Sequence, residues 1–197
     1  MARVGYDPRL GRIKTDAPGI VLDRAFLAHF QVSAADAVTA SDTGVHAAIA
    51  LTAAVQTVST AITNPAVPRN IRIKGNAAGI AGNVTIHGTN YAGEVITETL
   101  ALNGASVVEG AKAFKTVTQI DLPAETHAGT DTVSAGWGDI LGLPYKLSHN
   151  TVLATYHDNT LEGTAPTVTV SATALESNTV DLNTALNGKQ IDIYLIV

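Results

Sequence analysis

The sequence predicts an all-β protein, an antiparallel β-sandwich or barrel-like domain with an extended N-terminal arm. Three observations predict this class. Charged residues make up 15% of the 197 residues and aromatic residues 5%, and the many threonines, valines and glycines favour strands joined by turns. Short runs alternate apolar and polar residues with the period of a strand. Turn residues such as Asn-Gly separate these runs.

Residues 1–44 are predicted to form the arm, because glycine and proline interrupt its first 30 residues and no period is sustained there. Within the arm, residues 21–30 also fit a short amphipathic helix, since their apolar positions follow helical spacing. Phe26 and Phe30 lie in this stretch and need a surface that buries them. We expect this surface to be the protein's own core or a neighbouring subunit.

The arm is basic, whereas the rest of the chain is acidic. The formal net charge is −5, yet five basic residues meet only three acidic ones among the first 24 residues. Arg9 and Arg12 are therefore candidate contacts with an acidic surface of a partner or another subunit, and the alternative is a solvated and loosely ordered terminus. The acidic body lacks the clusters of lysine and arginine that bind phosphates. The most apolar stretch, residues 45–62, has too many polar side chains to cross a bilayer. We expect neither nucleic acid nor a membrane as a partner.

Residues 45–197 are predicted to form the β-rich domain. Residues 45–62 fit either strands or a helix with one apolar face. Beyond them, alternating apolar residues and turns such as Asn103-Gly104 mark the strands. The predicted strands cover residues 71–74, 83–89, 94–102, 112–122, 131–137, 152–157, 167–173 and 190–197. The last strand places its apolar residues on one side, so we expect it to pair into a sheet and its removal to be costly.

The sequence offers few candidate catalytic or metal-binding residues. The chain contains no cysteine, which excludes disulfides, thiolate metal sites and cysteine nucleophiles. The loop 121–131 holds three carboxylates and His127, ligands that suit calcium or a transition metal. Their spacing matches neither an EF-hand nor a zinc-binding helix, which favours a solvated turn. We therefore predict no metal and no cofactor.

Glu94 and Glu98 share one strand face, and paired acids are the groups that glycosidases use. An exposed edge or an ion pair with a nearby lysine is the simpler interpretation, so we predict no catalytic residues and no enzyme. Trp137, the only tryptophan, is predicted to anchor the core or a subunit interface. The alternative is a sugar-binding surface formed by Trp137, Tyr145 and Tyr156.

Five segments together resemble a family of structural proteins from tailed phages and prophages. They are residues 64–73, 82–90, 94–100, 110–117 and 136–144, so the resemblance covers roughly residues 55–150. It implies a protein of the assembled virion, an accessory head protein that decorates or cements the capsid and binds the major capsid protein. By analogy it also implies a symmetric homo-oligomer, with a trimer as the expected form. A structural or receptor-binding protein of the tail or fibre is the alternative.

The first residues lack the basic and apolar regions of a secretory signal. We therefore expect synthesis in the cytoplasm of a host bacterium, followed by incorporation into the virion at the capsid surface.

Overall fold

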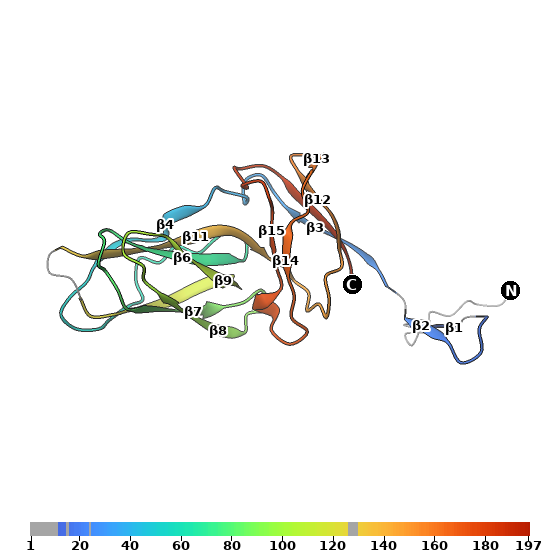
Figure 1. Ribbon diagram of the computed structural model, residues 1–197, viewed down its shortest axis with the longest axis horizontal. Helices are drawn as coiled ribbons and strands as arrows, with labels where there is room; N and C mark the ends of the chain where they lie inside the picture. Colours follow the sequence, from blue (N-terminus) through green and yellow to red (C-terminus); the bar gives the residue numbers. More distant parts are fainter. Residues whose placement is uncertain (1–11, 15, 24, 126–129) are drawn as a thin grey trace.

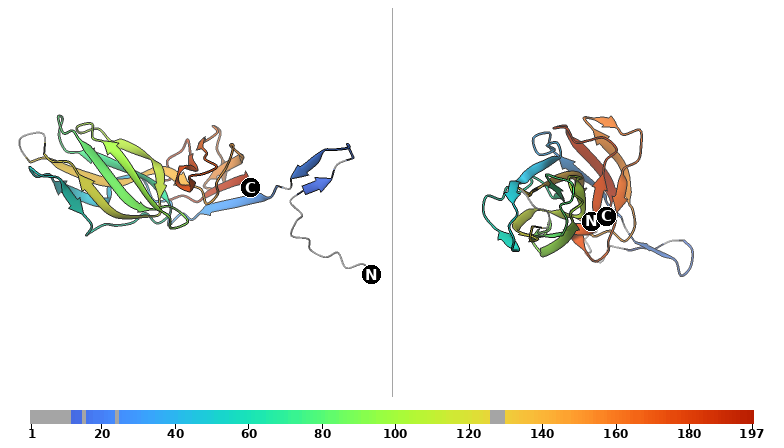
Figure 2. Two further views of the ribbon diagram at one scale, coloured as in Figure 1. Left: turned by 90° about the horizontal axis from the view of Figure 1, so that it is seen from below. Right: turned by 60° about the vertical axis from the view of Figure 1, so that its left-hand side comes forward.

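The computed structural model describes residues 12–14, 16–23, 25–125 and 130–197. Within these residues the secondary structure consists of antiparallel strands and one 3-10 turn, η1 (Leu175–Ser177). The strands form two curled sheets that face each other in a barrel-like body, a smaller sheet beside this body, and a separate hairpin (Figures 1 and 2). The predicted all-β class with a sandwich or barrel-like architecture is therefore confirmed.

The first sheet of the body has the strand order β5-β10-β7-β8. Its strands are β5 (Gln56–Val58), β10 (Thr116–Leu122), β7 (Asn83–Thr89) and β8 (Val95–Ala101). Buried residues alternate with more exposed ones along β7, as expected for a sheet with one face toward a core. Figure 2 shows this sheet curving around one side of the body.

The second sheet has the order β14-β15-β11-β6-β9, and β4 pairs with β11 outside this path. Its strands are β4 (Ser41–Ala50), β6 (Arg69–Gly75), β9 (Val108–Phe114), β11 (Thr132–Gly142), β14 (Thr167–Thr169) and β15 (Thr179–Asp181). The long strand β11 pairs with β4 and β6 along its first part and with β15 at Leu141 and Gly142. It therefore runs from the barrel-like body into the region of the smaller sheet.

The smaller sheet has the order β13-β12-β16-β3 and is called here the C-terminal sheet. Its strands are β3 (Leu27–Val32), β12 (Val152–His157), β13 (Thr160–Leu161) and β16 (Ile191–Ile196). The last strand pairs with β12 on one side and β3 on the other, which confirms that it lies within a sheet. The hairpin β1 (Arg12–Lys14) and β2 (Val21–Asp23) stands apart from the rest (Figure 1).

Two hydrophobic cores hold the chain together. The larger core lies between the two sheets of the body and contains Ile71, Ile86, Phe114 and Ile120, none of which is exposed. The second lies under the C-terminal sheet and includes Leu141 from the end of β11. Because β11 contributes to both cores, the C-terminal sheet is packed against the body through buried apolar contacts.

The predicted arm differs from the structure in its extent and its secondary structure. Residues 21–30 form no helix, because β2 and the start of β3 occupy this stretch. Leu27–Val32 instead pairs with β16 over six consecutive rungs, and Phe30 packs into the second core. A six-residue strand with alternating burial is thus more favourable here than a short helix, which gains little stability alone. The strands β3 and β4 belong to the folded part, so the predicted boundary at residue 44 lies inside β4.

In two other segments the strands of the structure differ from the predicted elements. Residues 45–62 contain most of β4 and all of β5, so the helical alternative is wrong. The single strand predicted over residues 112–122 is interrupted at Lys115, whose backbone N–H donates to the Thr89 carbonyl oxygen. On either side of it, β9 pairs with β6 in one sheet and β10 pairs with β7 in the other. The chain therefore crosses between the sheets at Lys115.

Replacing Gly136 with alanine is expected to destabilise the protein by about 1–3 kcal/mol or more. The added Cβ would clash with the backbone oxygen of Ser41, which cannot move without separating β4 from β11. Urea unfolding of Gly136→Ala measures this cost. Gly163→Ala is the matched control, because a Cβ there meets nothing within 4 Å. Equal stability of the two variants would contradict the close approach of the strands.

Candidate functional site

The outer face of the C-terminal sheet is the candidate functional site, because it gathers aromatic, polar and exposed apolar side chains. In β16, the buried Ile191, Ile193 and Leu195 point into the second core. The alternation of a strand therefore places Asp192 and Tyr194 on the opposite, outer face. The neighbouring strands extend this face, since Tyr156 pairs with Asp192 and His29 pairs with Tyr194.

Three rings lie side by side across the outer face. The His29 ring stacks on Tyr194 with a centroid distance of 4.6 Å and an interplanar angle of 5°. Tyr156 approaches Tyr194 edge-on from the strand on the other side, with centroids 5.8 Å apart and planes at 82°. These are the two favourable geometries of aromatic pairs, so the neighbouring strands fix the orientation of Tyr194.

The Asp192 carboxylate is held by three side chains. Its Oδ1 is hydrogen-bonded to His29 Nε2 at 2.7 Å and accepts from Gln31 Nε2 at 2.9 Å. Its Oδ2 accepts from Gln190 Nε2 at 2.9 Å. Burial by itself would raise the pKa of Asp192, but these hydrogen bonds favour the ionised form, and the pKa lies below its usual range. The carboxylate is thus a charged and preorganised group.

The lowered pKa of Asp192 predicts a loss of stability in acid. A carboxylate with a lower pKa in the folded protein stabilises the fold above its unfolded pKa of about 4, and this contribution disappears as the pH falls through the folded value. At pH 7, Asp192→Asn is expected to cost about 1–3 kcal/mol, because an amide nitrogen replaces one acceptor oxygen. The difference in unfolding free energy between wild type and variant should shrink from pH 6 to pH 3. A constant difference in denaturant unfolding over this range would contradict the prediction.

A hollow with a volume of about 250 Å³ opens on this face. Tyr156, Asn159, Asp192 and Tyr194 line it. Asn159 belongs to the turn between β12 and β13 and has a positive φ of 62°, a conformation that asparagine tolerates better than most residues. Two aromatic rings, a carboxylate and a carboxamide therefore converge on one small space.

The other end of the same sheet exposes apolar side chains. Phe26 and Leu27 are 67% and 63% exposed, and Val197 is 40% exposed. Phe26 and Val197 exchange two backbone hydrogen bonds of 2.9 Å, so they lie next to each other where the chain leaves the hairpin. Ile20, in the turn between β1 and β2, is also exposed. We call Phe26, Leu27 and Val197 the apolar end of the sheet.

The structure separates the predicted contact residues. Phe26 belongs to the apolar end, whereas Phe30 is partly buried in the second core and meets the Tyr91 ring edge-on at 6.4 Å. Arg9 lies outside the described residues, and Arg12 begins β1. Trp137 lies far along the chain in β11. Among the predicted contact residues whose side chains the structure describes, only Phe26 is largely exposed.

The predicted sugar-stacking residues do not form one surface. The Trp137 ring packs against Gly44, where a Cβ would lie 2.7 Å from ring atoms, and its Nε1 donates to the Thr39 carbonyl at 3.3 Å. Tyr145 packs against the second core. Only Tyr156 lies on the outer face. Tyr194 lies beside Tyr156 on this face and was not singled out from the sequence. The alternation of apolar residues in the last strand is the signal that could have placed Tyr194 on the outer face.

The predicted metal loop is only partly described, since His127 falls outside the described residues. Asp121 forms hydrogen bonds with Thr57, His87 and Gln119, each 2.8 Å long. Burial acts against ionisation of Asp121, but these bonds outweigh it and lower its pKa. Among the residues that the structure describes, no three His, Asp or Glu side chains are grouped to hold a metal. Asp121 therefore links β10 to its neighbouring strands β5 and β7 in the first sheet.

Glu94 and Glu98 also have separate structural partners. Glu98 Oε1 accepts hydrogen bonds from the backbone N–H groups of Ala111 and Lys112 at 2.7 and 3.2 Å. Burial raises the pKa of Glu98, and these two hydrogen bonds oppose the shift. Glu94 accepts from the Asn90 amide at 2.7 Å. Glu98 thus links β8 of the first sheet to β9 of the second.

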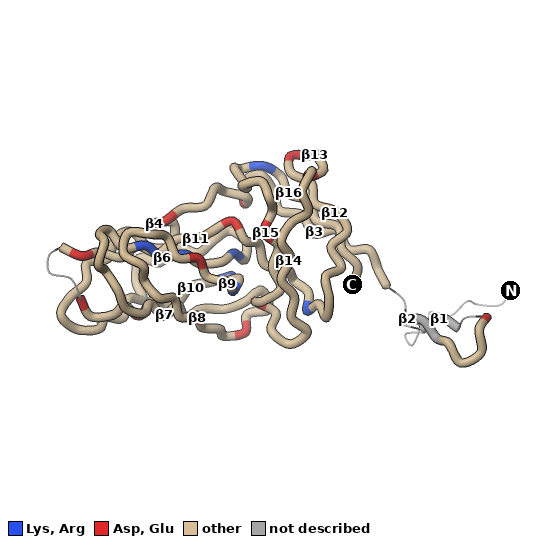
Figure 3. The backbone as a smooth tube through the Cα atoms, in the orientation of Figure 1, with Lys and Arg blue, Asp and Glu red and all other residues tan. Residues whose placement is uncertain are grey.

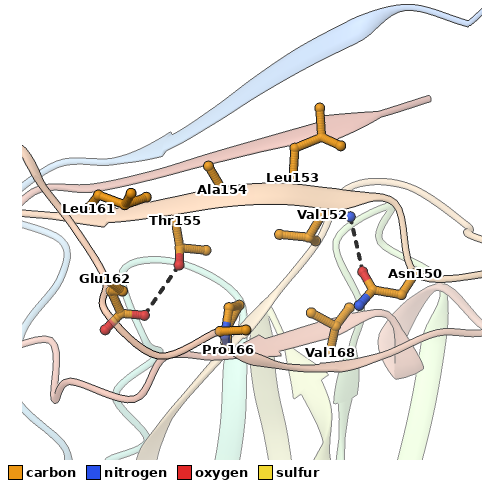
Figure 4. Close-up of a pocket in the computed structure, with 10 residues that line it drawn as sticks. Asn150, Val152, Leu153, Ala154, Thr155, Leu161, Glu162, Pro166 and Val168 are labelled. Carbon is orange, nitrogen blue, oxygen red and sulfur yellow. Dashed lines mark hydrogen bonds between the residues drawn. The ribbon is translucent and has the colours of Figure 1, made fainter.

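A second hollow, of about 200 Å³, lies on the inner side of β12 (Figure 4). Val152, Thr155, Pro166 and Val168 face one another across it. Its one carboxylate, Glu162, accepts from the Thr155 hydroxyl at 3.2 Å and from the Thr184 backbone N–H at 2.9 Å. No aromatic ring lines this hollow, and its single carboxylate is held by hydrogen bonds within the fold, so it is the weaker candidate for a binding site.

Charged side chains do not gather around either hollow. Figure 3 shows lysine and arginine in small separate groups with aspartate and glutamate between them. One such group joins Arg72 to Asp42 and Glu109, and Lys74 to Asp42, on the second sheet. The Arg72–Glu109 pair joins the neighbouring strands β6 and β9, whereas the pairs with Asp42 connect β6 to β4, both of which pair with β11.

Comparisons with protein-family models, curated proteins and solved structures gave no match for this chain. In the described part of the chain, no helix has the length and apolar character needed to cross a membrane.

Proposed function

We propose that this chain is a non-catalytic structural protein of a tailed-phage virion. In this proposal it decorates the head, binds the major capsid protein on the outer lattice and stabilises the shell. The resemblance of residues 55–150 to phage structural proteins motivates the proposal. The observation that carries it is the apolar end of the C-terminal sheet, together with the hairpin that leads into it.

The apolar end supports a docking role because its side chains would be covered in an assembly. Phe26 and Leu27 are each more than 60% exposed and adjacent, and Val197 extends the same surface. Adjacent exposed apolar side chains of this size are typical of protein interaction sites. The hairpin β1–β2 adds a second argument, because an isolated two-stranded hairpin is only marginally stable in water and gains stability from a partner surface.

The fold also suits a particle protein. Antiparallel strands satisfy the backbone hydrogen bonds, and two buried cores stabilise the chain without disulfides. A bound decoration protein would stabilise the shell by mass action in proportion to its preference for the assembled lattice. We further propose a homo-oligomer, with a trimer as the form to test by sedimentation.

The test uses phage heads that lack this protein. The purified full chain should co-sediment with such heads, and Phe26→Asp together with Leu27→Asp should weaken binding by more than tenfold, because a charge then replaces each apolar anchor. Leu161→Asp is the matched control, since Leu161 is 57% exposed in the same sheet but pairs with Tyr156, away from the apolar end. Electron-microscope labelling of this chain in whole particles is the second measurement, and label over the tail at far lower copy number would instead support the tail or fibre alternative. Failure of the full chain to bind heads would overturn the decoration role.

A further inference from the structure

The hollow on the outer face has the composition of a sugar-binding site. It is lined by two tyrosines, one carboxylate and one carboxamide, and no lysine or arginine lines it. It lies at the opposite end of the sheet from the apolar end. The pairs Leu27–Ile196 and Gln31–Asp192 are separated by four residues along β3, or about 13 Å. The hollow is therefore a surface distinct from the proposed docking surface.

The aromatic rings supply the apolar part of the site. His29 stacks on the Tyr194 ring, and the ring of Tyr156, from the neighbouring strand β12, stands nearly perpendicular to it with the centroids 5.8 Å apart. The two tyrosines thus form a fixed corner that needs no rearrangement before binding, which lowers the entropic cost of association. Tyrosine rings combine an apolar surface with a polar tip, and a sugar ring likewise combines C–H faces with hydroxyl groups.

Asp192 supplies the polar part. An ionised carboxylate offers about four acceptor positions. His29 and Gln31 occupy two on Oδ1, and Gln190 occupies one on Oδ2. By this count one acceptor position on Oδ2 is unused, and Asn159, which also lines the hollow, adds a carboxamide that can both donate and accept. A hydroxyl group is a donor that suits this carboxylate.

Charge and size narrow the ligand class. A fixed carboxylate repels phosphate, sulfate and acidic sugars, and the nearby Lys189 is paired with Asp158 at 3.0 Å. The volume of about 250 Å³ is below the roughly 300–1,000 Å³ of pockets for drug-sized ligands, so it suits one ring at a time. We propose that the hollow formed by Tyr156, Asn159, Asp192 and Tyr194 binds one ring of a neutral glycan. This inference does not depend on the proposed capsid role.

The first experiment measures binding of neutral sugars to the full chain. Methyl glycosides of glucose, galactose and N-acetylglucosamine are titrated while saturation transfer from the protein is followed by NMR. A neutral polysaccharide built from the same sugars distinguishes a site for free sugars from one for polymer chains. At least one sugar should receive saturation, with the signals of Tyr156 and Tyr194 shifting in the protein spectrum.

Variants test the residues of the hollow. Tyr156→Ala should weaken binding by about tenfold, as expected for loss of one aromatic contact, whereas Tyr156→Phe should keep most of it. Asp192→Asn should also weaken binding, and Leu153→Ala, outside the hollow, should leave it unchanged. Near-ultraviolet circular dichroism verifies that each variant is folded. If Asp192→Asn does not fold, the comparison of Tyr156→Ala with Tyr156→Phe still tests the hollow.

Two results would overturn the proposal. One is the absence of saturation transfer with every neutral sugar at concentrations of tens of millimolar. The other is binding that Tyr156→Ala leaves unchanged. If no sugar binds and Tyr156→Ala abolishes self-association in sedimentation, the hollow is a contact between copies of the chain. Binding of phage heads tests the capsid role separately, because that experiment relies on Phe26 and Leu27.

Discussion

A chain that ends at Gln190 will fail to form the C-terminal sheet. This truncation removes β16, which lies between β12 and β3 and pairs with both. It also removes Ile191, Ile193 and Leu195, whose side chains are fully buried in the second core. Each buried aliphatic side chain contributes about 1.5–3 kcal/mol, and the two neighbouring strands would lose their hydrogen-bonding partner.

The three side chains alone account for about 5–9 kcal/mol, which is comparable with the total stability of many domains, about 5–15 kcal/mol. We therefore expect the truncated chain to lose protection of the amides of β3 and β12 in hydrogen exchange, or not to accumulate as a soluble protein. Removing Val197 alone is the control, because this residue is 40% exposed and lies beyond the strand. Native protection of β12 in the truncated chain would show that β16 is dispensable.

Replacing Arg69 with alanine should destabilise the protein by about 3–5 kcal/mol. Arg69 is fully buried, its Nη1 donates to the Val38 carbonyl at 2.6 Å, and its Nη2 pairs with Asp139 at 2.9 Å. Burial lowers the pKa of Arg69 to about 10, against the opposing effect of Asp139, so it remains charged at neutral pH. The alanine variant would leave a cavity, an unpaired carbonyl group and a carboxylate without its partner.

Urea unfolding provides the measurement for Arg69→Ala, and Lys189→Ala provides the comparison. Lys189 pairs with Asp158 at a similar distance of 3.0 Å, but both side chains are about half exposed. Exposed ion pairs contribute at most about 1 kcal/mol. Similar losses in the two variants would mean that the burial of Arg69 has no energetic consequence. Arg69→Met separates the two effects, because it refills the cavity without restoring the hydrogen bonds.

Local signals in the sequence were sufficient for much of the strand pattern. The strands over residues 83–89 and 152–157 have the predicted bounds, because turn residues flank short alternating runs at both ends. The last strand was also predicted, since isoleucine and leucine at every second position require a buried face. Tyr156 was singled out because it is one of few aromatic residues in the chain.

The helix predicted over residues 21–30 shows where local signals fail. A ten-residue stretch with apolar side chains at several positions fits a helical or a strand period almost equally well, so the partner strand decides between them. The partner of Leu27–Val32 is β16, more than 150 residues away in the sequence. The pairing with β16 also explains why Phe30 is partly buried against the second core while Phe26, four residues earlier, is exposed.

The sequence by itself determined the all-β class, most strand positions and the absence of cysteine chemistry. These features depend on composition and on neighbours within a few residues. The tertiary structure decided which strands pair, that Arg69 is buried, and that His29 meets Asp192 across 163 positions. It also assembled the hollow from Tyr156 and Tyr194 and left Trp137 against Gly44. Contacts between distant residues decide these features, because pairing and burial depend on what the opposite strand presents.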